Sequence, residues 1–225
     1  MHRFFCDKKL DSNYFELSDE LLKHLKVLRI GSEEFLVNYQ NEFYKCKLEN
    51  NLAKIISKQE INNELDYKIY LAIGLIKFER FEWLIEKATE LGVFEIVPFY
   101  SQFTQKHKLL NQFQNKKNRF EKIIKFAAEQ SFRNIIPNLK NPISFEDLLN
   151  FYVNQKLVAH EISDNQNFDL NLLTKNDLLL TIGSEGGFSS DEIAKFKEAN
   201  FKVIHLGKTI LRSETAAISL ISKVK

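Results

Sequence analysis

The chain has 225 residues, of which 44% are hydrophobic and 28% charged, and its formal net charge is +2 at pH 7. This composition excludes disorder, collagen and a coiled coil as the main architecture, and the length allows one large or two smaller domains. The chain has no apolar run long enough for a membrane span and no signal-peptide layout at MHRFFCDKKL, so we expect a soluble, cytoplasmic protein. Cys6 and Cys46 lack metal-ligand spacing and are expected to be buried free thiols.

Residues 1–66 are predicted to form a small β-barrel or sandwich, because short alternating segments between turn residues are typical of strands. The segments are HRFFC, YFEL, FLVNYQ, FYKCKL and LAKIISK. One helix is expected among them, since Ser18 is an N-cap candidate followed by two acidic residues and leucines at helical spacing. The asparagine-rich stretch 61–66 is expected to be a linker.

From residue 67 the pattern changes to strands that alternate with helices. The predicted strands are 70–76, 94–100, 156–161, 177–183 and 202–207; the predicted helices are 78–92, ended by Gly92, one in the basic middle segment, one that begins at Ser144, and two more at about 189–199 and 214–223. This alternation predicts a mostly parallel α/β domain with helices on both faces of the sheet.

The excess positive charge is confined to residues 101–140, which carry nine basic and two acidic side chains, a net +7. Apolar residues from Phe120 to Ala128 recur at helical spacing and predict the buried stripe of an amphipathic helix. The other side of this helix carries Lys122, Lys125 and Arg133. Two interpretations stay open: a solvated helix face, or a patch that contacts phosphates.

Four of the seven glycines fall within 25 residues, at the ends of two predicted strands: LLLTIG before SEGG, and VIHLG before KTILRSETA. Ligands of open α/β sheets bind outside the carboxyl ends of strands, where glycine lets the backbone approach them closely. GSEGG lacks the Lys-Ser/Thr of a P-loop and is not a G-x-G-x-x-G turn, and its Glu185 argues against a phosphate. A ligand with an adenine or an ammonium group suits this pocket better.

Four blocks in this order resemble the signature blocks of the RsmE family: KFERFEWLIEKATELGV (77–93), AAEQSFR (127–133), IGSEGGFSSDE (182–192) and LGKTILRSETA (206–216). HRFF and HLKVLR near the N-terminus resemble the PUA-like barrel of the same family. The resemblance implies an RNA-binding PUA-like β-barrel over 1–66 and a SPOUT-type methyltransferase domain with a trefoil knot over 67–225. It also implies a homodimer that uses S-adenosylmethionine to methylate N3 of a uridine in 16S ribosomal RNA of the small subunit.

The resemblance also implies which residues surround the cofactor. They are His160, Glu161, Ile182, Gly183, Gly186, Gly187, Leu206, Gly207, Ile210, Leu211, Thr215 and Ala216. The sequence departs from the family at Ser184 and Lys208, where the family usually has proline, and at Thr209, where it usually has arginine.

Three charged residues near the glycine turns are candidates for catalysis. Removal of the N3 proton of a uridine is favoured by a carboxylate that accepts the proton and by an arginine that stabilises the anion. Glu185 and Glu214 are the candidate acids, and Arg212 is the candidate cation. The alternative for Glu214 is a helix-start carboxylate that interacts with the helix dipole, and the alternative for Glu185 is a surface turn.

The candidate RNA-binding residues are basic side chains of the barrel and of two helices. They are Arg3, Arg29, Lys77, Arg80, Lys87, Lys122, Lys125 and Arg133. The alternative for those on the 78–91 helix is a salt-bridged solvent face, and Trp83 on that helix is expected in the core. No metal site, membrane or DNA partner is expected. Two other functions stay open: a non-catalytic RNA-binding or ribosome-assembly protein, and a related methyltransferase that acts on another RNA.

Overall fold

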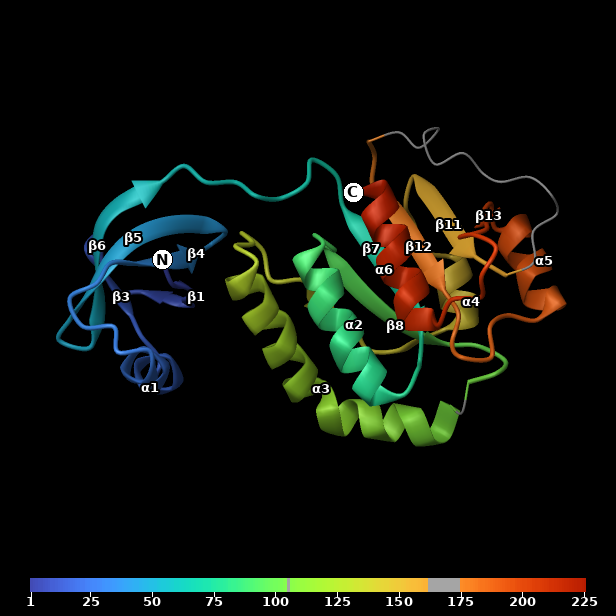
Figure 1. Cartoon of the computed structure of the whole chain (residues 1–225), viewed down its shortest axis with the longest axis horizontal. Helices are drawn as coiled ribbons and strands as arrows, with labels where there is room; N and C mark the ends of the chain where they lie inside the picture. Colours follow the sequence, from blue (N-terminus) through green and yellow to red (C-terminus); the bar gives the residue numbers. More distant parts are fainter. Residues whose placement is uncertain (105, 162–174) are drawn as a thin grey trace. The chain divides into compact units, whose positions relative to one another are not determined.

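A computed structural model of the chain describes residues 1–104, 106–161 and 175–225, and these residues divide into two compact units. The first unit contains residues 1–64 and 128–135, and the second contains residues 65–127 and 136–225 (Figure 1). The first boundary lies two residues before the predicted one. Residues 128–135 were expected in the second domain, and this expectation is wrong: they belong to the first unit.

The first unit is a barrel-like six-stranded sheet with the strand order β1-β4-β5-β6-β3-β2. Its elements are β1 (Arg3–Phe5), β2 (Lys8–Lys9), β3 (Tyr14–Glu16), α1 (Asp19–Val27), β4 (Phe35–Tyr39), β5 (Glu42–Glu49) and β6 (Leu52–Gln59). The five longer strands and the helix match the predicted ones, and Ser18 caps α1 by accepting a hydrogen bond from the backbone N–H of Leu21. Cys6 and Cys46 are buried free thiols, as predicted, and burial raises the pKa of Cys46 to about 12.

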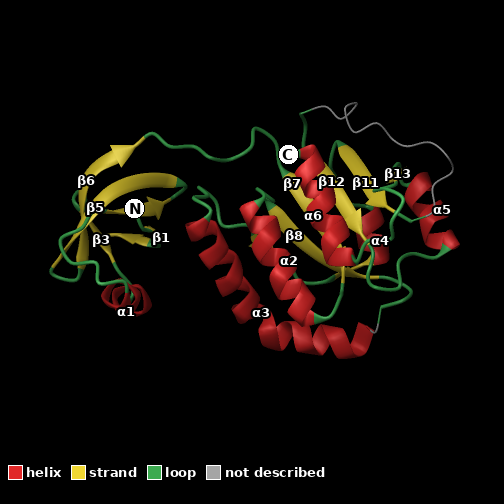
Figure 2. Ribbon diagram, viewed as in Figure 1, coloured by secondary structure: helices red, strands yellow, loops and turns green. Residues whose placement is uncertain are grey.

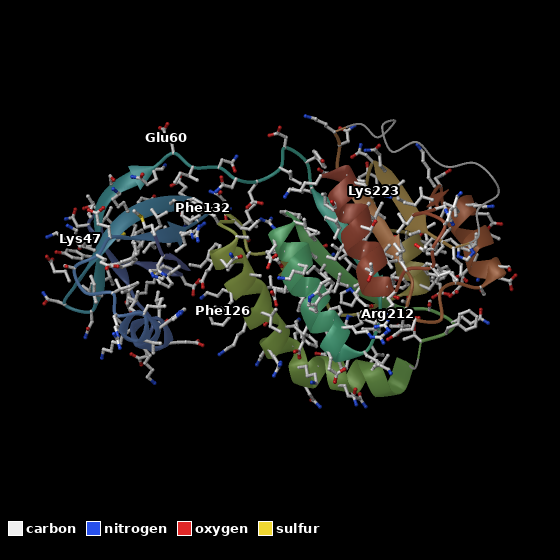
Figure 3. All side chains as sticks on the ribbon, in the orientation of Figure 1. Lys47, Glu60, Phe126, Phe132, Arg212 and Lys223 are labelled. Carbon is white, nitrogen blue, oxygen red and sulfur yellow. The ribbon has the colours of Figure 1, made fainter. Side chains whose placement is uncertain are left out.

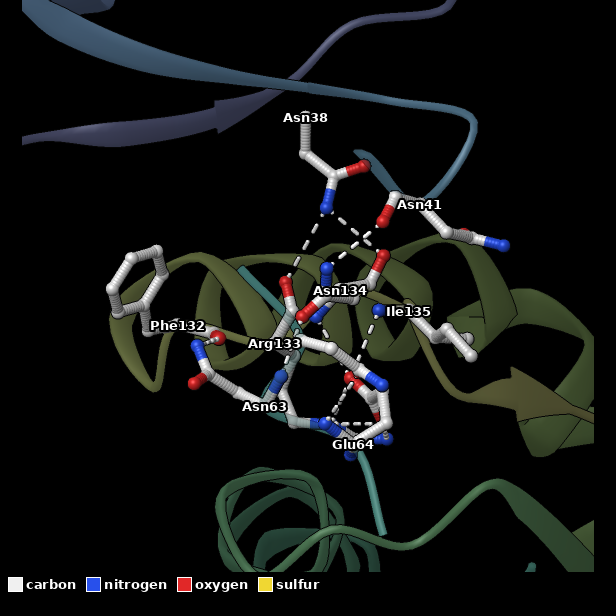
Figure 4. Close-up of polar contacts among 9 residues, drawn as sticks. Asn38, Asn41, Asn63, Glu64, Phe132, Arg133, Asn134 and Ile135 are labelled. Atoms are coloured by element: carbon white, nitrogen blue, oxygen red, sulfur yellow. Dashed lines mark hydrogen bonds and ion pairs between the residues drawn. The ribbon is translucent and has the colours of Figure 1, made fainter. Parts of the chain in front are cut away.

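A buried polar network joins residues 128–135 to the sheet of the first unit (Figure 4). The Arg133 guanidinium, only 4% exposed, forms hydrogen bonds and an ion pair with the Glu64 carboxylate at 2.5–3.0 Å. Glu64 also accepts hydrogen bonds from the backbone N–H groups of Asn134 and Ile135, and the Asn38 amide donates to the Asn134 carbonyl at 2.9 Å. Arg133 was expected to bind RNA; its burial and its pairing with Glu64 give it a structural role instead.

The second unit is a seven-stranded sheet in which every strand pair is parallel, in the order β10-β8-β7-β12-β11-β13, with β9 beside β8. Its strands are β7 (Ile69–Gly74), β8 (Glu95–Tyr100), β9 (Asn138–Leu139), β10 (Ile143–Ser144), β11 (Gln155–Ala159), β12 (Leu178–Ile182) and β13 (Lys202–Ile204). Its helices are α2 (Phe78–Glu90), α3 (Lys106–Gln130), whose last three residues belong to the first unit, α4 (Phe145–Leu149), α5 (Ser190–Glu198) and α6 (Ser213–Val224).

Helices cover both faces of this sheet, as the sequence predicts (Figure 2). Successive residues of a strand point to opposite faces. Leu71 and Leu180 accordingly pack with α2, α3 and α6 in one apolar cluster, whereas Ala72 and Leu179 pack with α4 and α5 in another. The strands therefore read as continuous apolar runs, which is typical of a parallel sheet buried on both faces.

Two expectations about helix α2 are wrong. Trp83 was expected in the core but is 45% exposed, because it lies outside the buried stripe formed by Phe81, Leu84, Ile85 and Ala88. Gly92 was expected to be the C-cap; the C-cap is Leu91, and Gly92 is the next residue, with a φ of +97°, in the left-handed position just past the helix end. Among the helices that the structure describes, none has the length and apolar character needed to cross a membrane.

The Glu64–Arg133 pair generates a prediction about stability. Replacing Glu64 by alanine removes the carboxylate that pairs with the buried Arg133 guanidinium, so we expect Glu64→Ala to lower the free energy of unfolding by about 3 kcal/mol. Urea denaturation followed by circular dichroism measures this change. Lys8→Ala is the control, because the exposed Lys8–Glu16 pair lies in the same unit and should contribute little. Equal effects of the two substitutions would contradict the structural role of Arg133.

Candidate functional site

A cavity of about 430 Å³ lies in the second unit, at the carboxyl ends of β11, β12 and β13. It is lined by the loops that follow these strands, residues 159–161, 182–188 and 205–213, together with Arg80 and Ala216. β11 pairs with β12 on one side and with β13 on the other, so the three loops leave the sheet side by side. The two glycine turns singled out in the sequence therefore line one pocket.

Most of the residues predicted around the cofactor line this cavity. All of them except Thr215 do so, and Ser184, Lys208 and Thr209, the three departures from the family pattern, line it too. Thr215 is exposed on α6 outside the lining. Ala159, Phe188, His205 and Ser213 also belong to the lining and were not predicted; their nearness to the glycine turns in the sequence is the signal that could have found them.

The glycines let the turns take their observed shape. A Cβ on Gly183 would lie 3.1 Å from the Gly187 Cα, so the two ends of this turn approach each other more closely than most Cβ contacts allow, and a side chain at residue 183 would require the turn to shift slightly. Gly187 and Gly207 have φ values of +66° and +139°, in the region that favours glycine.

Gly74, at the end of β7, lies outside the cavity lining but supports the loop after β12, a role that was not predicted from the sequence. A Cβ on Gly74 would lie 2.4 Å from the backbone nitrogen of Ser184 and 2.9 Å from the carbonyl carbon of Gly183. The loop of residues 183–188, which follows β12, is called the pocket loop below. Its first turn packs directly on the backbone of β7. A glycine at the end of an apolar strand was the available signal, but its partner is more than 100 residues away in the sequence.

Glu185 lies in the pocket loop and contacts the start of α2. Its Oε1 atom accepts a hydrogen bond from the backbone N–H of Lys77 at 3.2 Å and lies 3.7 Å from Nη1 of Arg80. Lys77 is the N-cap residue of α2 and provides no side-chain cap of its own. Glu185 therefore places a negative charge at the positive end of the helix dipole, which stabilises both the loop and the helix start.

Glu214 and Arg212 lie at the start of α6 but in different environments. Glu214 is buried in the first turn, lies outside the cavity lining, and has its Oε1 atom 3.8 Å from Nε of Arg80. This position agrees with the helix-start interpretation. Arg212 is exposed at the N-cap position and lines the cavity (Figure 3). Its side chain forms no hydrogen bond or ion pair with the residues that the structure describes, so its donors are open to a ligand.

The other basic candidates have varied surroundings. The ε-amino group of Lys87 donates hydrogen bonds to Glu86 at 2.7 Å and Glu90 at 2.8 Å, which raise the pKa of Lys87, so this residue belongs to a salt-bridged helix face. Arg29 and Lys122 are exposed and Lys125 is half-buried. In the first unit, the Arg3 guanidinium lies over the Phe132 ring at 4.8 Å, a cation–π contact.

Comparisons with known proteins identify the family. Residues 63–225 match the model of an RNA methyltransferase domain. The chain is 44% identical over 229 residues to ribosomal RNA small subunit methyltransferase E of Mesomycoplasma hyopneumoniae, covering 99% of this chain and 98% of that protein. The chain belongs to the ribosomal RNA small subunit methyltransferase E family. The Bacillus subtilis member is 30% identical over 93% of this chain and 89% of its own length.

Solved structures of a methyltransferase E and of a putative methyltransferase share the fold of this chain. The Neisseria gonorrhoeae enzyme bound to S-adenosylmethionine has a TM-score of 0.86 and 26% identity, covering 99% of this chain and 95% of that one. A Legionella pneumophila protein in complex with the same cofactor has a TM-score of 0.86 and 29% identity, covering 99% and 96%. The mixed α/β architecture is consistent with the SPOUT fold; the trefoil knot stays a prediction from the resemblance.

The close approach of Gly74 to Ser184 gives a second testable prediction. The added methyl group of Gly74→Ala would collide with backbone atoms rather than with a movable side chain, so we expect a loss of about 1–3 kcal/mol in stability. Thermal unfolding measures it. Gly31→Ala is the control, because a Cβ there meets nothing within 4 Å. Unchanged stability of Gly74→Ala would show that the pocket loop does not depend on this contact.

Proposed function

We propose that the chain transfers a methyl group from S-adenosylmethionine to N3 of a uridine in 16S ribosomal RNA of the small subunit. The observation that carries this proposal is the pocket at the ends of β11, β12 and β13, in a fold that matches structures bound to S-adenosylmethionine at a TM-score of 0.86. The names of the curated relatives support ribosomal RNA as the substrate. The choice of N3 of a uridine comes from the resemblance to the family.

The residues of the pocket fit S-adenosylmethionine. The volume of about 430 Å³ lies in the range of small-molecule sites. The side chains of Ile182, Leu206 and Leu211 offer apolar surface for an adenine, and the carboxylates of Glu161 and Glu185 are opposite in charge to an ammonium group. Exposed backbone groups of the glycine turns supply hydrogen-bond donors and acceptors at the strand ends. When bound, S-adenosylmethionine supplies a methyl group that its sulfonium charge makes electrophilic.

The charged residues of the pocket supply the chemistry at the uridine. Arg212, with an exposed guanidinium whose donors are open, would stabilise the negative charge that spreads over the uracil when N3 loses its proton. Glu185 is the better-placed of the two candidate acids, because it lines the cavity and Glu214 does not. Its Oε1 atom is held by Lys77, which leaves Oε2 as the oxygen that would accept the proton.

The RNA would be held by basic side chains outside the pocket. In the first unit, Arg3 lies on β1 and Arg29 in the turn after α1, and α3 carries Lys122 and Lys125; these side chains would contact phosphates. We also propose that the protein is a homodimer, as the resemblance implies. Light scattering on the purified protein should then give twice the chain mass of 26.4 kDa, and a monomer mass would contradict the dimer.

Transfer of labelled methyl from S-adenosylmethionine to small-subunit RNA tests the function directly. We expect label in 16S RNA and, after digestion, a uridine methylated at N3 as the labelled nucleoside. RNA binding without label would favour the non-catalytic RNA-binding protein. Label on another nucleoside or another RNA would favour a related methyltransferase.

The role of Arg212 gives a third prediction. We expect Arg212→Ala to lower the rate of methyl transfer at least about a hundredfold while the protein stays folded, because the anion loses its cation. Single-turnover transfer assays and circular dichroism measure the two effects. Lys223→Ala, an exposed basic residue near the other end of α6, is the matched control and should retain full activity (Figure 3). Full activity of Arg212→Ala would remove Arg212 from the site.

A further inference from the structure

Arg80 lies in the first turn of α2, beside the loop after β12 and the first turn of α6. Its guanidinium is placed between two carboxylates, with Nη1 3.7 Å from Oε1 of Glu185 and Nε 3.8 Å from Oε1 of Glu214. Glu185 belongs to the loop after β12, and Glu214 belongs to the first turn of α6. Arg80 therefore faces one carboxylate from each of the two glycine-turn segments of the sequence, Glu185 from 182–192 and Glu214 from 206–216.

The two acids depend on this cation because they carry the same charge. The Glu214 side chain is only 12% exposed, so water screens its charge weakly, and the Arg80 side chain is 31% exposed. Without Arg80, the two carboxylates would repel each other across a partly buried space. The distances of 3.7 and 3.8 Å are longer than a hydrogen bond, so Arg80 acts here through its charge.

The Glu185 loop also contacts the backbone of the chain just before Arg80. Its carboxylate accepts the hydrogen bond from the Lys77 N–H, and Ser184 packs on Gly74 at the end of β7. The segment from Gly74 to Arg80 therefore holds one wall of the pocket at three points. Of these points, Arg80 is the one that also reaches the start of α6.

We propose that Arg80 is a positioning residue, which holds the Glu185 loop and the start of α6 at the spacing that binds the methyl donor. This inference rests on the proposed function, because it assigns the cavity to S-adenosylmethionine. It replaces the role in RNA binding that was expected for Arg80 from the sequence. In this role Arg80, which also lines the cavity, acts through its charge on Glu185 and Glu214.

A double-mutant cycle on donor affinity tests the proposal. Isothermal titration calorimetry with S-adenosylhomocysteine, which does not react, gives the dissociation constant of each variant. We expect Arg80→Ala to weaken binding about tenfold in the natural sequence and less than about twofold when Glu185→Gln and Glu214→Gln are already present. Arg80→Lys, which keeps the charge, should recover part of the affinity.

The control variant is Arg119→Ala, which removes an exposed arginine of the same unit that pairs with Glu82 on α2 at 2.7 Å. It should bind S-adenosylhomocysteine like the natural protein, and circular dichroism checks that each variant is folded. Equal weakening by Arg80→Ala in both backgrounds would overturn the proposal, because Arg80 would then act independently of the two acids. Unchanged donor affinity of Arg80→Ala in the natural sequence would also overturn it.

The experiment separates this inference from the proposed function. If the natural protein binds S-adenosylhomocysteine and Arg80→Ala binds it equally well, the positioning role fails and the methyltransferase function stands. If the natural protein does not bind S-adenosylhomocysteine at millimolar concentration, the proposed function fails and the inference falls with it.

Discussion

The register of four parallel strands is the constraint on which the pocket depends. Ile73 of β7 is paired with Ile182 of β12, Ile182 with Ala159 of β11, and Ala159 with Ile204 of β13. The last residues of β11, β12 and β13 therefore lie at one level, and the loops that follow leave the sheet along one edge. Because the pairing is parallel, all of these ends are carboxyl ends, which is where open α/β sheets bind their ligands.

The register alone would leave three independent loops, and further contacts fix one of them. Gly74 extends β7 by one residue beyond Ile73, so its backbone meets the turn at Gly183 and Ser184. The first turn of α2 then presents the Lys77 N–H and the Arg80 guanidinium to Glu185. Close backbone packing and the contact between Arg80 and Glu185 thus hold the pocket loop on the sheet. Arg212 lines the cavity and stays exposed.

Features that depend on neighbouring residues could be predicted from the sequence. The caps at Ser18 and Ser144 follow from a few adjacent side chains, and the glycine turns at 183–187 and 207 follow from glycines at the ends of apolar runs. The strand and helix alternation predicted the α/β class for the same reason, because periodicity is a local property.

Features that depend on distant pairing could not be predicted. Arg133 belonged by helical spacing to a basic face, but its carboxylate partner, Glu64, lies 69 residues earlier and draws residues 128–135 into the first unit. Arg80 likewise looked like one of several basic residues on a helix, and its position between Glu185 and Glu214 arises only when three segments meet. Both arginines were expected from the sequence to be exposed cations that bind RNA, but in the structure both are paired with carboxylates.

A crystal structure of the protein with S-adenosylhomocysteine would show whether the ends of β11, β12 and β13 form the methyl-donor site. We expect the ligand to lie among residues 159–161, 182–188 and 205–213. A ligand bound elsewhere on the molecule, with this cavity filled by water alone, would contradict this expectation.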